Sequence, residues 1–99
     1  MEYAMQLHFL YAAGSIQILI EQPKVQLGCP ENVYIPDFFV VDIDGTPKYK
    51  YIDVKGVETP AFKKNKKLWK AYGPCPLDIV KKNGKAWKRE VIEGKQCQK

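Results

Sequence analysis

Two extended apolar segments with a tight turn between them set the framework of this sequence. Residues 33–43 and 49–57 are rich in Val, Ile, Phe and Tyr, and Asp44-Gly45-Thr46-Pro47 between them has the composition of a turn. Strands joined by so short a connection pair antiparallel. Because residues 33–43 are apolar on both faces, we expect that strand to be covered on both sides. The sequence therefore predicts a β-hairpin inside a layered domain.

Helices are expected on either side of this hairpin. Residues 1–13 place apolar side chains at helical spacing and stop at Gly14, and residues 16–27 alternate as a first strand. Thr59 and Pro60 form an N-cap and first position for a helix that ends at Tyr72, before Gly73. Residues 77–80 are predicted to pair parallel with 49–57 after this crossover helix, and 86–92 form a candidate last strand. The predicted fold class is α/β, a single domain over residues 1–99 with an αβββαβ order and a mixed sheet flanked by helices.

Composition excludes several classes of protein. The 99 residues contain one histidine, His8, so sites built on several histidines and Ser-His-Asp hydrolases are not expected; the apolar neighbours of His8 favour a structural role. Three cysteines fit neither a closed set of disulfides nor a paired zinc knuckle. The longest uncharged stretch, residues 3–20, is interrupted by polar residues, so no membrane span or signal peptide is expected. The sequence predicts a protein of the reducing cytoplasm that bears its chemistry on carboxylates and lysines.

Charge is distributed unevenly along the chain. Residues 1–47 hold one lysine and six acidic residues, a net charge of −5, whereas residues 48–99 hold fifteen Lys or Arg and five acidic residues, a net charge of +10. A strongly basic half in a small domain is typical of a protein that binds a polyanion, because each neutralised phosphate releases condensed counterions. This asymmetry favours DNA or RNA as the partner, although a solubilising lysine surface would have the same composition.

Three polar side chains are predicted to meet on the hairpin. Asp53 and Lys55 point the same way because alternate residues of a strand share a face. A turn centred near Gly45 and Thr46 makes the numbers of opposed residues sum to 90 or 92, which places Asp37 opposite Asp53 or Lys55. Two carboxylates and an ammonium among apolar strands are costly unless they pair with one another or with a metal ion.

This arrangement suits phosphodiester hydrolysis. Two neighbouring aspartates offer hard oxygen ligands to Mg²⁺ or Mn²⁺, and the nearby lysine can orient water or stabilise charge that develops on the phosphate. The competing interpretation is a surface Asp-Lys ion pair with an unrelated turn aspartate, because Asp-x-Lys alone is a weak signal.

The segments 34–38, 52–56, 59–63 and 66–68 together resemble the PD-(D/E)XK nuclease superfamily, in particular small phage-encoded endonucleases similar to bacteriophage endonuclease I, which resolves Holliday junctions. Gln22-Pro23 resembles a Gln-Pro on the first strand of a related phage nuclease family. The resemblance extends from Glu2 to Val80. It implies a restriction-endonuclease-like core and a Mg²⁺- or Mn²⁺-dependent DNA endonuclease.

The resemblance also implies roles for individual residues. Asp37 and Asp53 would be metal ligands together with the backbone carbonyl of Val54, and Lys55 would be the catalytic lysine. The superfamily usually adds a glutamate from the first helix, for which Glu2 is the first choice and Glu21 the reserve. The basic side of the second helix would follow the DNA backbone through four residues, Lys63, Lys66, Lys67 and Lys70.

Two classes of function remain open at this point. The first is an endonuclease that nicks duplex DNA or, as a homodimer, resolves branched junctions, with substrate shape or a small helper protein providing selectivity. The second is a non-catalytic nucleic-acid-binding module that keeps the fold without the metal. An interaction protein that merely blocks a partner would show no salt-dependent binding to DNA.

Overall fold

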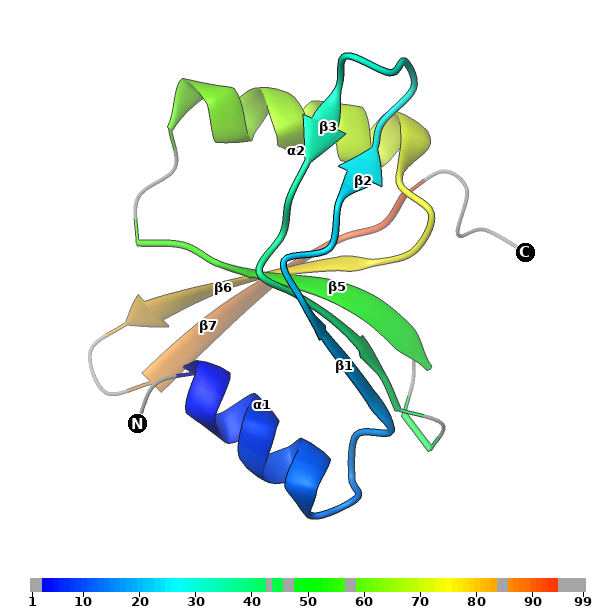
Figure 1. Ribbon diagram of the computed structural model, residues 1–99. Coiled ribbons are helices and arrows are strands. Elements are labelled where there is room, and N and C mark those ends of the chain that lie inside the picture. Colours follow the sequence, from blue (N-terminus) through cyan, green and yellow to red (C-terminus); the bar gives the residue numbers. More distant parts are fainter. Residues whose placement is uncertain (1–2, 43, 46–47, 57–58, 84–85, 95–99) are drawn as a thin grey trace.

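The computed structural model describes residues 3–42, 44–45, 48–56, 59–83 and 86–94. Strands β1, β4, β5, β6 and β7 lie in that order in a mixed five-stranded sheet, and β2 pairs with β3 in a separate ribbon. Helix α1 covers one face of the sheet and α2 the other (Figure 1). The predicted α/β class with helices flanking a mixed sheet is therefore confirmed. The elements in chain order are α1 (Tyr3–Ala12), β1 (Ile18–Glu21), β2 (Val25–Gln26), β3 (Val33–Tyr34), β4 (Phe38–Val41), β5 (Tyr49–Val54), α2 (Pro60–Tyr72), β6 (Leu77–Asn83) and β7 (Ala86–Ile92).

The predicted hairpin is formed by β4 and β5, which pair antiparallel. Phe38 lies opposite Ile52 and Val41 opposite Tyr49, so the position numbers of opposed residues sum to 90. This is one of the two registers that the turn predicts. Continued by one residue beyond the ladder, it sets Asp37 opposite Asp53.

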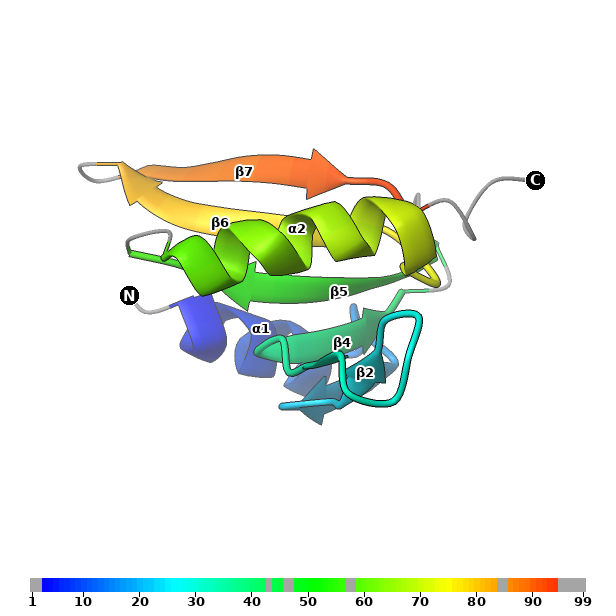
Figure 2. The same cartoon turned by 90° about the horizontal axis from the view of Figure 1, so that it is seen from above.

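The crossover from β5 through α2 to β6 also has the predicted form. Thr59 caps α2 by accepting a hydrogen bond from the backbone N–H of Phe62 at 3.2 Å, and Pro60 follows at the first helical position. Strand β6 then pairs parallel with β5, as predicted, and β7 pairs antiparallel with β6. Viewed from above the sheet, α2 runs along β5 and β6 (Figure 2).

Two strands predicted as continuous are interrupted in the structure. The predicted strand over 16–27 divides into β1 and β2 because the chain turns at Gln22, whose φ is +52°. The predicted strand over 33–43 divides into β3 and β4 around Pro36, which has no N–H for a ladder hydrogen bond. Both breaks lead to the β2–β3 ribbon, which lies on the α2 side of the sheet (Figure 1).

A hydrophobic core lies on each face of the sheet. On the α2 side, Trp69 is fully buried, packs edge-to-face against Tyr34 and Tyr51, and donates its indole N–H to the backbone carbonyl of Cys75 at 2.8 Å. On the α1 side, Leu7 packs with a second set of buried apolar residues. That second set comprises Ile16, Phe38, Val40, Ile52 and Val80.

At ten and thirteen residues, the helices of the described chain are too short to cross a bilayer.

Candidate metal and nucleic-acid site

Asp53 and Lys55 lie at the end of β5 and face the same side of the sheet, as their spacing predicts. The Lys55 ammonium is 3.4 Å from Asp53 Oδ2 and 4.7 Å from the centre of the Phe62 ring, which the first turn of α2 supplies. The Asp53 side chain is buried, with a relative exposure of 2%. A cation placed between a carboxylate and an aromatic face is attracted by both, so this lysine is held in place.

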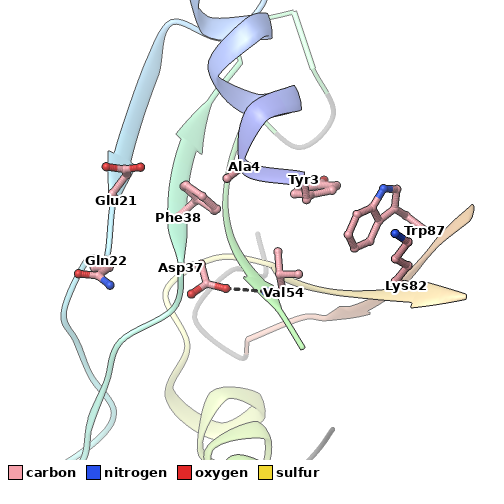
Figure 3. A pocket seen from close by; sticks show the side chains of 9 residues that line it. All are labelled: Tyr3, Ala4, Glu21, Gln22, Asp37, Phe38, Val54, Lys82 and Trp87. Carbon is pink, nitrogen blue, oxygen red and sulfur yellow. Dashed lines mark hydrogen bonds between the residues drawn. The ribbon is translucent and has the colours of Figure 1, made fainter. Parts of the chain in front are cut away.

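Asp37 is fixed between β1 and β5, one residue before β4 begins. Its Oδ2 accepts a hydrogen bond from the backbone N–H of Val54 at 2.8 Å (Figure 3). Its backbone carbonyl accepts another, also 2.8 Å long, from the N–H of Gln22. The structure therefore brings Asp37, Asp53 and Lys55 together where β4 begins and β5 ends.

The two carboxyl groups oppose each other electrostatically. Burial, with a further contribution from the nearby Asp37, raises the pKa of Asp53 from its ordinary 3.8 to about 6. The Tyr34 hydroxyl, which donates a hydrogen bond to Asp53, acts in the opposite direction, and so does the Lys55 ammonium. A divalent cation would stabilise the ionised form of Asp53 beside this second carboxyl group.

The backbone of Val54 adds a third oxygen to this corner. Beside the parallel pairing of β5 with β6, the Lys55 N–H donates a hydrogen bond to the Val80 carbonyl at 2.9 Å. The N–H and C=O of one strand residue point to the same edge, so those of Val54 both point away from β6. Since the Val54 N–H meets Asp37, its carbonyl emerges toward β4 as well. This orientation is compatible with the carbonyl ligand that the sequence resemblance implies.

Of the two candidates for a third carboxylate, only Glu21 is described, and it does not join Asp37 and Asp53 in one cluster. Glu2, the first choice, lies outside the described residues. Glu21, the reserve, lines the same pocket as Asp37 but its Oε1 is 3.0 Å from the Nε2 of His8. Within the described ranges, no three His, Cys, Asp or Glu side chains are close enough together to hold a metal ion. His8 is exposed on α1 rather than part of the core, and its described contact is this one with Glu21.

The four lysines predicted to follow DNA do not share one environment. Lys63, Lys67 and Lys70 are exposed on α2. Lys66 is different, because its ammonium is 3.2 Å from Glu90 Oε1 on β7 and its side chain is only 18% exposed. Of the four predicted lysines, three therefore face solvent and one is held against the sheet.

A pocket of about 750 Å³ opens on the α1 side of Asp37. Glu21 and Gln22 stand on one side of it and Lys82 and Trp87 on the other, with Asp37 between them (Figure 3). The remaining lining residues are Tyr3, Ala4, Phe38 and Val54.

Sequence reasoning missed Tyr34 and this pocket. Tyr34 precedes Asp37 by three residues, but its contact with Asp53 depends on the break between β3 and β4, which shows only in three dimensions. The pocket joins α1 to the β6–β7 hairpin, and the sequence signal that could have indicated it is Trp87, which lies in a basic segment near the C-terminus.

Comparisons with known proteins add no relative. No family model matches the chain, and neither the curated proteins nor the solved structures contain a similar one. The functional argument therefore depends on the site itself.

Proposed function

We propose that the chain is a metal-dependent DNA endonuclease of the PD-(D/E)XK type, which nicks duplex DNA or cuts branched junctions. The observation that carries the proposal is the meeting of Asp37, Asp53 and Lys55 where β4 begins and β5 ends. The order α1, β1, β4, β5, α2, β6 supports it, because this is the αβββαβ order of such a core with the β2–β3 ribbon inserted.

The donor set fits Mg²⁺ or Mn²⁺. Asp37 and Asp53 provide two carboxylates, and the Val54 carbonyl points to the same corner. Protein sites for Mg²⁺ commonly use one or two carboxylates and leave the other positions to water and substrate phosphates. An ion bound there would polarise a phosphoryl oxygen and make a water molecule more acidic.

The remaining groups of the chain bind the substrate and stabilise charge. Lys55 is held by Asp53 and by the Phe62 ring, so its ammonium is positioned to donate hydrogen bonds to a phosphate that gains negative charge during attack. The Tyr34 hydroxyl fixes the orientation of Asp53 by donating a hydrogen bond to its carboxylate. The exposed lysines of α2 give sequence-independent contacts to the DNA backbone.

The test is cleavage of supercoiled plasmid and of a four-way junction in Mg²⁺, Mn²⁺ or a chelator. Asp37→Asn and Lys55→Ala should each lower the cleavage rate at least about 100-fold, since each removes charge stabilisation at the reacting phosphate. Asp42→Asn is the matched control, because Asp42 lies at the opposite end of the β4–β5 hairpin and binds the Asp44 backbone N–H. Relaxed circles indicate nicking, and linear product indicates paired cuts.

The opposite result is equally clear. Salt-dependent DNA binding without strand cleavage in either metal would replace the enzyme with a non-catalytic nucleic-acid-binding module. Absence of binding would exclude both interpretations.

A further inference from the structure

The pocket beside Asp37 has an aromatic and cationic wall that the metal site does not use. Tyr3 on α1 and Trp87 on β7 pack edge-to-face, with ring centres 5.5 Å apart. The ammonium of Lys82 is 5.9 Å from the centre of the Trp87 ring. Aromatic rings combined with a nearby cation form the usual surface for stacking a nucleobase while a neighbouring phosphate is neutralised.

The facing side of the pocket is polar and its backbone is constrained. Gln22 has a φ of +52°, a conformation that residues with a side chain rarely adopt. Its N–H bonds the carbonyl of Asp37, so the strained residue is tied directly to the metal-site corner. Strain of this kind is often retained at functional sites. Glu21 and Gln22 offer carboxylate and amide groups that can hydrogen-bond the edge of a base.

The size and position of the pocket suit one nucleotide. Its volume of about 750 Å³ is within the range of small-molecule sites. Asp37 and Val54 form part of its lining, so a nucleotide in the pocket would lie beside Asp37, one of the two proposed metal ligands. A base inside a continuous duplex cannot enter, because it is stacked and paired.

We propose that this pocket binds one unpaired nucleotide of a DNA substrate, with its base against Trp87 and Tyr3 and its phosphate near Lys82. The proposal rests on the proposed function for the identity of the ligand. It deepens that function by naming the substrate class: DNA with an unpaired nucleotide beside the cut, as in a bulge, a flap or an open junction. Continuous duplex is then the poorer substrate.

The experiment compares two DNAs that each carry one 2-aminopurine, unpaired as a single-nucleotide bulge in one and paired within a continuous duplex in the other. Binding is measured in chelator by fluorescence, because stacking on an aromatic ring quenches 2-aminopurine. We expect the wild type to bind the bulged DNA about 10-fold tighter than the duplex. Trp87→Ala and Lys82→Ala should abolish this preference. Should Trp87→Ala fail to fold, Trp87→Phe is measured in its place and should retain part of the preference.

Lys88→Ala is the matched control, because Lys88 follows Trp87 on β7 and points to the other face of the sheet. It should weaken binding of both DNAs equally. Equal binding of the two DNAs by the wild type, or a preference that is undiminished in Lys82→Ala and in the folded Trp87 variants, would overturn the proposal. Because the binding assay contains no metal, its result is separate from that of the cleavage assay. Absence of cleavage together with a preference for the bulged DNA would contradict the proposed endonuclease activity but not the proposed nucleotide pocket.

Discussion

At the scale of the residue, the position of Asp53 is unfavourable for folding. Its carboxylate is buried beside a second carboxylate, and its pKa is raised to about 6. The folded state therefore binds this proton more tightly than the unfolded state. The stability that the proton contributes is complete below pH 3.8 and is lost as the pH rises through 6. At neutral pH the folded protein holds an ionised group that would be better solvated in the unfolded chain.

Asp53→Asn should consequently stabilise the protein at pH 8 while it abolishes cleavage. We expect an increase in the free energy of unfolding of about 1–2 kcal/mol at pH 8 and little change at pH 4. Urea denaturation at both pH values measures it. The same gain at both pH values, or a loss at pH 8, would show that the ionised Asp53 is not destabilising.

At the scale of the element, α2 connects the fold to the site. Its first turn supplies Phe62, which is buried and lies beneath the Lys55 ammonium. The start of α2 is set by Thr59, whose hydroxyl accepts the Phe62 N–H. Fraying of this turn would loosen both the core and the lysine.

Thr59→Ala should lower the free energy of unfolding by about 1 kcal/mol, because the Phe62 N–H in the first turn of α2 loses its hydrogen-bond acceptor. Thr59→Ser keeps the hydroxyl and serves as the matched control. Denaturation curves of the two variants provide the comparison. Equal stability of the two would mean that the cap contributes nothing.

Elements with local signals were predictable and those that depend on distant contacts were not. The turn composition of residues 44–47 limited the hairpin to two registers, one of which is observed, and Thr59, Pro60 and Gly73 indicated the bounds of α2. The β2–β3 ribbon was missed because continuous apolar alternation hid the turn at Gln22. In the site, two-residue spacing placed Asp53 with Lys55, and the register placed Asp37 near them. Nothing local indicates that Tyr34 reaches Asp53 or that Tyr3 reaches Trp87.

At the scale of the whole molecule, the basic charge of the second half is carried partly by the exposed side of α2. Lys67→Ala should weaken DNA binding and lower the slope of log K against log salt concentration by about 1, since one phosphate contact is lost. Lys66→Ala is the comparison, and its effect on the slope should be smaller because Lys66 is paired with Glu90. Fluorescence anisotropy at several salt concentrations measures both. A larger change for Lys66 would contradict this assignment of the binding surface.

Titration of the protein with Mn²⁺ by calorimetry tests most directly whether Asp37 and Asp53 hold a cation. We predict one ion per chain in the wild type and no binding in Asp37→Asn or Asp53→Asn. Because the pKa of Asp53 is about 6, binding at pH 6 should release more protons than binding at pH 8. Unchanged Mn²⁺ binding in both variants would contradict the account, as would a wild type that binds no Mn²⁺ at pH 8.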